Sequence, residues 1–117
     1  MKIRLYQTDK GSAFVDYDTT CKLYGCVDLH GYQTRFAGNV DFITKDFTMS
    51  DLEKLYELFN VNPPEKFTGR SMSVSDIIVI EGVNPYRFFF CDNVGFRELR
   101  WAEPDKPGSL KMQEVAR

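Results

Sequence analysis

The residues of this chain that could do chemistry gather in its second half. Three serines alternate, at Ser71, Ser73 and Ser75, and lead into Asp76, while a second aspartate, Asp92, follows the next apolar run. Two carboxylates at one end of a hairpin would be a start for binding a divalent metal and hydrolysing a phosphoester. A nucleophilic serine needs a neighbouring general base, and none of these serines lies in a signature such as G-x-S-x-G. The pattern therefore indicates no recognisable catalytic set.

Zinc binding is the other chemistry that the residue types allow. Cys21 and Cys26 have four residues between them and only His30 nearby, so a fourth ligand would be missing unless Cys91 folds back to supply it. An odd number of cysteines excludes a complete disulfide framework and favours reduced thiols in a cytoplasmic protein. Small buried thiols are the commoner explanation. We therefore expect neither a metal nor another cofactor.

Composition and charge limit the classes of function. The chain has 117 residues, of which 43% are hydrophobic and 15% aromatic, which suits one folded domain. Its net charge of -2 argues against strong direct DNA or RNA binding, which normally requires a basic surface. We see no secretory signal and no apolar stretch long enough to span a membrane, so we expect a cytoplasmic protein.

The elements that must position these residues can be read from hydrophobic periodicity. We expect strands over residues 2–7, 32–42, 77–80 and 88–90, with helices over residues 13–24 and 47–61. Residues 8–12 are typical of a turn, and Gly25 could be the left-handed residue that ends the first helix. This order predicts an α+β fold, with a small, mainly antiparallel β-sheet and two helices packed on one side. The domain should cover residues 1–102, and residues 103–117, which contain two prolines and a glycine, should form a flexible tail.

The second helix has the clearest local signals. Thr48 is a plausible N-cap, and Asp51 takes the acidic position of a capping box. One apolar stripe then faces the core, whereas Glu53 and Glu57 face water. The stripe consists of Leu52, Leu55, Tyr56 and Phe59.

The two strands that follow are continuous apolar runs, which suit strands covered on both faces. Helices on a single side would leave the other face of these strands bare, so the N-terminal segment, the tail or another chain must cover it. If Glu81 lies opposite Tyr86, then Asp76 lies opposite Cys91. Asp76 and Asp92 would then come to the same end of the hairpin.

The alternating serines have a structural explanation. In an extended segment their hydroxyl groups would lie on one side, with Met72 and Val74 on the other. Serine and aspartate side chains can also bond nearby backbone groups and so fix an irregular turn before a strand.

Residues 52–99 resemble the YodL domain, a family of small proteins and modules found largely in mobile elements of Gram-positive bacteria. The resemblance is carried by "LYELFN", the two prolines after it, "FTG", "SMSVSDIIVI" and "FFCDNVGFREL". Where family members commonly show a histidine between the glycine and the first serine, this chain has Arg70, so chemistry that relies on an imidazole there would be lost. No biochemical activity is transferred residue by residue.

The resemblance implies the setting of a phage or conjugative element. We therefore expect a non-enzymatic inhibitor of bacterial defence, an anti-CRISPR protein that binds a type II CRISPR effector nuclease or its guide RNA complex. A metal-dependent nucleic-acid hydrolase, and an interaction module that regulates conjugation or forms a homodimer, are the alternatives. The candidate partner-binding residues are Asp46, Asp51, Glu53, Glu57, Arg70, Ser71, Ser73, Ser75, Asp76 and Asp92.

Overall fold

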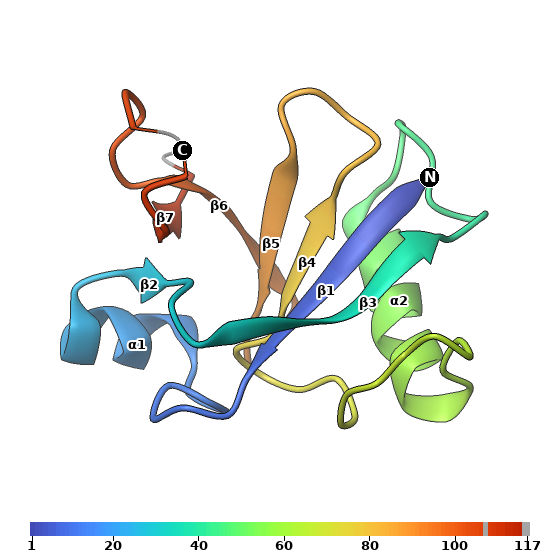
Figure 1. Cartoon of the computed structure of the whole chain (residues 1–117), viewed down its shortest axis with the longest axis horizontal. Helices are drawn as coiled ribbons and strands as arrows, with labels where there is room; N and C mark the ends of the chain where they lie inside the picture. Colours follow the sequence, from blue (N-terminus) through green and yellow to red (C-terminus); the bar gives the residue numbers. More distant parts are fainter. Residues whose placement is uncertain (107, 116–117) are drawn as a thin grey trace.

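The computed structural model of the chain describes residues 1–106 and 108–115. Across these residues one β-sheet and two helices form a small α+β fold, so the predicted class is confirmed (Figure 1). The elements are β1 (Lys2–Thr8), α1 (Tyr17–Tyr24), β2 (Val27–Asp28), β3 (Tyr32–Asn39), α2 (Met49–Val61), β4 (Ile77–Ile80), β5 (Arg87–Cys91), β6 (Phe96–Trp101) and β7 (Lys111–Glu114).

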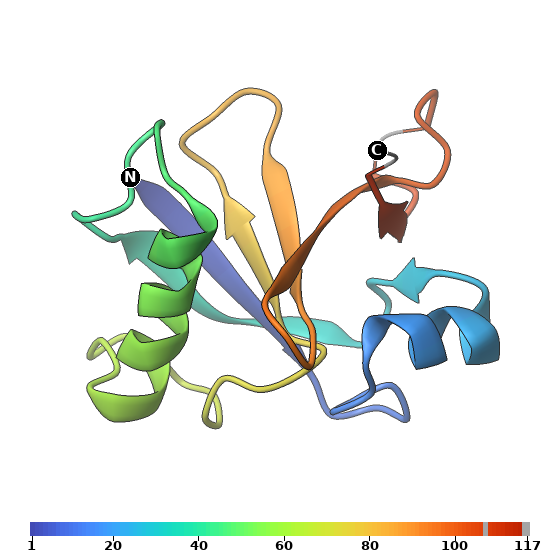
Figure 2. The same ribbon diagram turned by 180° about the vertical axis from the view of Figure 1, so that it is seen from behind.

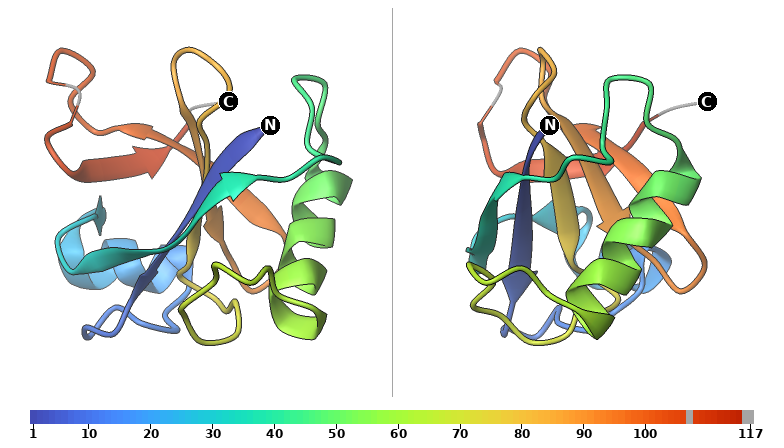
Figure 3. Two further views of the ribbon diagram at one scale, coloured as in Figure 1. Left: turned by 45° about the vertical axis from the view of Figure 1, so that its right-hand side comes forward. Right: turned by 90° about the vertical axis from the view of Figure 1, so that its right-hand side faces the viewer.

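The sheet is antiparallel throughout and strongly curled (Figure 3). Its strand order is β2-β7-β6-β5-β4-β1-β3, so β2 and β3 are the two edges. These edge strands follow one another along the chain and are separated only by residues 29–31. The curl therefore brings the two ends of the sheet close to one another without pairing them, which leaves a seam between β2 and β3.

The two helices cover opposite faces of the sheet (Figure 2). Ile78 packs in one cluster with Leu52, Leu55 and Phe59 of α2, whereas its neighbour Ile77 packs in a second cluster with Tyr17 of α1. Tyr56, the fourth residue of the predicted stripe, is instead exposed. Adjacent residues of a strand point to opposite faces, so the clusters lie on different sides. The expectation that both helices pack on one side is corrected here: each apolar face of the central strands needs its own cover.

This arrangement explains the continuous apolar runs of β4 and β5. All four residues of β4 are buried, and they alternate between the two clusters. The second face is covered by α1 and by the curled part of the sheet, including Val27 of β2 and Met112 of β7. The chain thus covers both faces of its central strands itself, and the apolar runs are no argument for a second chain.

Local signals define the helix ends. In α2 the capping box is present. The Thr48 N–H donates to the Asp51 carboxylate at 2.9 Å, and the Asp51 N–H is directed toward the Thr48 side chain. In α1 the expected C-cap Gly25 has a φ of 81°, but the helix begins at Tyr17 and not at residue 13. Phe14 has a φ of 65°, which a right-handed helix does not allow, and Asp16 is the N-cap. Within residues 1–106 and 108–115, no helix combines the length and apolar character needed to cross a membrane.

The predicted hairpin register is confirmed. Ile77 pairs with Phe90 and Ile80 with Arg87, which places Asp76 opposite Cys91. The Cys91 N–H donates to the Asp76 carbonyl oxygen at 2.8 Å, and the Ser75 N–H donates to that of Cys91 at 2.8 Å.

The prediction of a flexible tail over residues 103–117 is wrong for residues 111–114, which form strand β7. β7 pairs with β6 on one side and with β2 on the other. Met112 is 0% exposed within the second cluster. Residues 107, 116 and 117, which also belong to the predicted tail, lie outside the described residues. The sequence gives little sign of β7, because its four residues contain only one strongly apolar side chain.

We predict that Met112→Ala lowers the free energy of unfolding by about 2–5 kcal/mol, because the substitution removes a buried side chain and leaves a cavity. Urea denaturation of the whole chain measures the change. Lys111→Ala is the control, since Lys111 is exposed on the same strand. A loss for Met112→Ala within about 0.5 kcal/mol, as for a surface residue, would show that β7 does not belong to the core.

Candidate functional site

The motif residues surround a buried carboxylate at one end of the sheet. Tyr6 pairs with Ile77, so continuing this register places Gln7 opposite Asp76, whose other neighbour is Cys91. The side chain of Asp76 is 0% exposed. Burying an ionised carboxylate is unfavourable unless it is paired and hydrogen-bonded. The residues around Asp76 must therefore supply those partners.

Arg70, Gln7 and Ser73 supply them. Two guanidinium nitrogens of Arg70 lie 3.1 and 3.2 Å from the two oxygens of Asp76. The Gln7 amide and the Ser73 backbone N–H each donate to Oδ2, at 2.9 and 2.8 Å. Burial raises the pKa of Asp76 above its ordinary value, and these hydrogen bonds act in the opposite direction. The guanidinium fork matches a carboxylate in a way that an imidazole cannot.

Arg70 also joins the motif to the start of the chain. Its Nη2 donates to the carbonyl oxygen of Thr8 at 3.2 Å, and its guanidinium carbon lies 4.4 Å from the ring centre of Phe14. Phe14 is 60% exposed. A cation above an aromatic face is attracted by the ring, so this contact fixes both side chains at the surface.

The three serines do not form a ladder on one side of an extended segment. Ser73 closes a turn, in which its carbonyl oxygen accepts from the Asp76 N–H at 3.1 Å, and its hydroxyl donates to the Ser71 carbonyl oxygen at 3.1 Å. Ser75 is buried, and its hydroxyl accepts from the Phe14 N–H at 3.0 Å. The alternative explanation, an irregular turn fixed by serine and aspartate side chains, fits these contacts.

Two residues of this region have left-handed backbones. Ser75 has a φ of 83° and Phe14 a φ of 65°, and the two are hydrogen-bonded to one another. The hydroxyl of Tyr32 donates to the Ser75 carbonyl oxygen at 2.7 Å, and burial raises the pKa of Tyr32. Strained conformations of non-glycine residues persist only where the surroundings enforce them. Here the turn, the first loop and β3 hold one another in place.

Asp92 lies at the same end of the hairpin as Asp76, but its partners belong to α1 and β6. It accepts from the Tyr17 N–H of α1 at 3.2 Å and from Nε of Arg97 at 2.6 Å. Arg97 also contacts Glu114 of β7 at 3.1 Å. The hydrogen bond from Arg97 to Asp92 is the main cause that raises the pKa of Arg97. Asp92 therefore helps to fix α1 and β7.

The two aspartates are engaged by different arginines and different elements. Within residues 1–106 and 108–115, no group of three or more histidine, cysteine, aspartate or glutamate side chains is placed to hold a metal ion. The three cysteines are not joined to one another, and burial raises the pKa of Cys91 to about 12. Both aspartates thus act as structural anchors in this fold.

The acidic residues predicted on and before α2 lie at the surface, apart from the half-buried Asp51 of the capping box. Glu53 lines a groove of about 320 Å³ between α2 and the turn that joins β5 to β6. We call it the α2 groove. Its lining residues are Glu53, Tyr56, Val74, Cys91, Asp92, Asn93, Gly95 and Phe96. Glu57 lines a smaller hollow on another side of α2, together with Phe42, Leu58 and Val61. Asp46 is exposed in the loop before the helix.

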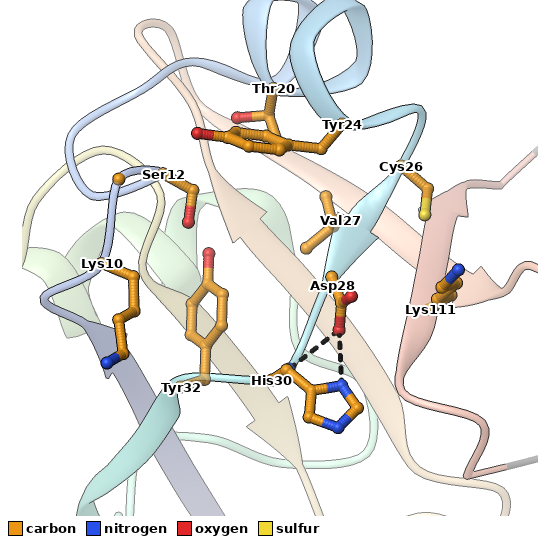
Figure 4. A pocket seen from close by; sticks show the side chains of 11 residues that line it. Lys10, Ser12, Thr20, Tyr24, Cys26, Val27, Asp28, His30, Tyr32 and Lys111 are labelled. Carbon is orange, nitrogen blue, oxygen red and sulfur yellow. Dashed lines mark hydrogen bonds and ion pairs between the residues drawn. The ribbon is translucent and has the colours of Figure 1, made fainter.

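A second pocket, of about 290 Å³, lies at the seam of the curled sheet (Figure 4). It contains none of the predicted partner-binding residues, but Cys26 and His30, which were considered above as zinc ligands, both line it. We call it the seam pocket. It is lined by Lys10, Gly11, Ser12, Thr20, Tyr24, Cys26, Val27, Asp28, His30, Tyr32 and Lys111. The sequence gives only a turn signal at residues 8–12, and Lys111 belongs to the unpredicted strand. Local patterns do not indicate that these segments meet.

We predict that Arg70→Ala lowers the free energy of unfolding at neutral pH by about 3 kcal/mol, because it leaves a buried carboxylate without its cation. Arg100→Ala is the matched control, since Arg100 is exposed. Urea denaturation measures both.

The loss should shrink in acid. Removing Arg70 raises the folded-state pKa of Asp76 further above the unfolded value, so the folded variant binds a proton more readily and gains stability as the pH falls through the raised pKa. Comparing about pH 7.5 with about pH 4.5 tests this sign. A loss independent of pH would mean that Arg70 acts through packing alone.

Comparison with known proteins identifies the family of the chain. A model of the YodL-like domain matches residues 2–101, which include β1 to β6 and both helices. This match extends the resemblance seen in the sequence over residues 52–99 to nearly the whole described chain. No curated protein matches the chain, and no solved structure matches it. The chain belongs to the family of YodL-like domains.

Proposed function

We propose that this chain is a non-enzymatic binding domain that inhibits bacterial defence, and that its target is a type II CRISPR effector nuclease or its guide RNA complex. The observation that supports a binding role is a contrast between the ionisable residues of the serine–aspartate motif and the carboxylates of α2. The ionisable residues of the motif bind one another inside the fold, as Asp76 does with Arg70. By contrast, Glu53 beside the α2 groove and Glu57 beside the neighbouring hollow are left at the surface.

The α2 groove has the features of a contact surface for a macromolecule. Tyr56 is 40% exposed at its wall, and Val94, in the adjoining turn, is 92% exposed. Exposed aromatic and apolar side chains beside a hollow are typical of the centre of protein interfaces. The half-buried Phe96 also lines the groove. A partner side chain could therefore bury apolar area here.

The charges around α2 favour a basic partner. Glu53 and Glu57 lie one helical turn apart and are both exposed, each beside its own hollow. Among the described residues, neither has an ion-pair partner, whereas Lys54 lies 3.7 Å from Asp51. Complementary charge across an interface mainly increases the rate and specificity of association. A nuclease channel that holds nucleic acid offers such a basic surface.

The choice of target follows from the expected setting of the family. If YodL-like domains travel in phages and conjugative elements, the host nucleases that attack those elements are natural partners. The domain would compete with nucleic acid for the channel or hinder loading of the guide. This mechanism requires a binding surface and no catalytic group.

We predict that the purified chain, in molar excess, slows guide loading or target cleavage by a type II CRISPR effector. Reversing both charges in Glu53→Arg/Glu57→Arg should weaken binding at least about tenfold, mainly by lowering the association rate. Glu65→Arg is the matched control, because Glu65 is exposed and lines neither hollow. Surface plasmon resonance and a cleavage assay measure the two effects.

Two outcomes would contradict the proposal. Guide loading and cleavage that stay unchanged at large excess would remove the CRISPR effector as the target. Equal binding by the double variant and by Glu65→Arg would remove the α2 surface as the site of contact.

A further inference from the structure

The seam pocket has the chemistry of a site for a small ligand, and it is separate from the α2 groove. Its lining residues come from the first loop, α1, β2, β3 and β7. Its volume of about 290 Å³ is at the lower end of the range for ligand pockets. A pocket of this size can hold one small organic molecule and not a protein segment.

Aromatic and apolar side chains form the walls. Figure 4 shows the rings of Tyr24 and Tyr32 on either side of the space, with Val27 between them. Flat rings pack well against aromatic side chains, either offset or edge to face. The walls therefore favour a ligand that contains a flat ring.

The charged groups of the pocket favour an anion. Asp28 is engaged with His30, because its Oδ1 accepts from the His30 backbone N–H at 2.9 Å and lies 3.1 Å from Nδ1 of the ring. Among the described residues, neither Lys10 nor Lys111 has a carboxylate in ion-pair contact. The pocket thus has two unpaired cations against one carboxylate that already has partners.

The end of the pocket near Lys10 is the better place for the anion. Lys111 is the cross-strand partner of Asp28 in the pairing of β2 with β7. Burial acts to raise the pKa of Asp28, but its hydrogen bonds with His30 and the charges of His30 and Lys111 together outweigh burial, so the pKa is lowered. Part of the Lys111 charge is therefore already balanced. Ser12 and Lys10 lie on the side of the pocket opposite Lys111 (Figure 4). The Lys10 ammonium group points away from the Ser12 hydroxyl, so the end of the lysine side chain must turn inward to reach an anion beside Ser12. A lysine and a hydroxyl group are both donors that bind a phosphate oxygen.

Several contacts hold this end in shape before any ligand binds. The stem of Lys10 lies against Gly31, where an added Cβ would meet Lys10 Cγ at 2.7 Å. The hydroxyl of Tyr24 lies beside Gly11, 3.2 Å from where a Cβ would be. The hydroxyl of Tyr32 is fixed by its hydrogen bond to Ser75. A preformed pocket loses less conformational entropy when it binds.

We propose that the seam pocket binds a small molecule that joins a flat ring to a phosphate-like anion, the class that nucleoside monophosphates represent. The anion lies between Lys10 and Ser12, and the ring lies between Tyr24 and Tyr32. Lys111 adds a weaker attraction from the opposite side.

A titration of the isotope-labelled whole chain, followed by two-dimensional amide NMR, tests the proposal. The probes are AMP, adenosine and inorganic phosphate. Saturable shifts are expected at residues 10–12, 24–32 and 111, with AMP bound at least about tenfold more tightly than either of its parts. The same spectra show whether each variant is folded.

Three variants locate the site. Lys10→Glu should weaken AMP binding by about tenfold or more, and Lys111→Glu should weaken it less. Lys66→Glu is the matched control, since Lys66 is exposed and does not line the pocket. Lys10→Gln removes the charge without reversing it and replaces Lys10→Glu if that variant does not fold.

The proposal is overturned by any of three results. AMP that binds no more tightly than inorganic phosphate would show only a general attraction to lysines. Shifts confined to other residues would place the ligand elsewhere. Equal affinities for the Lys10 and Lys66 variants would exclude the assigned anion position.

Discussion

The fold depends on the burial of one carboxylate. Asp76 sits where β1, β4 and β5 run side by side, and its side chain is shielded from water. A charge in such a place must be matched by donors, and those donors come from two separate parts of the chain: Gln7 of β1, and Arg70 and Ser73 in the segment before β4. Replacing such a pair by well-packed apolar residues is often neutral, whereas removing one partner alone is strongly destabilising. The turn before β4 thus takes its shape from an ionic requirement rather than an apolar one.

The strain beside this pair follows from the same requirement. Once Arg70 reaches both Asp76 and the Thr8 carbonyl oxygen, the first loop must pass close to the serine turn. Phe14 and Ser75 meet there in left-handed conformations, and each satisfies a polar group of the other segment. The loop also forms one wall of the seam pocket. The motif therefore shapes a surface in which its own residues take no part.

The elements with strong local signals were predictable from the sequence. The capping box of α2, the Gly25 cap and the β4–β5 register follow from contacts between residues close together along the chain, and all three are confirmed. The predictions that failed concern elements whose structure depends on contacts between residues far apart along the chain. β7 has a single buried apolar residue, and its strand character comes from β2 and β6. The placement of α1 could not be predicted, because the apolar face that it covers exists only after the sheet has curled. The seam pocket was missed for the same reason: its segments are local in space and not in sequence.

The pairing of β7 with β2 has a consequence for how the chain folds. These strands are about 80 residues apart, and β7 is the only strand that pairs with β2 among the described residues. Until β7 docks, β6 has no neighbour on that side, and the apolar surface beneath α1 is incomplete. Long-range antiparallel pairing of this kind forms late and slowly. This side of the sheet therefore forms after the local contacts around α2, and until then it exposes apolar surface.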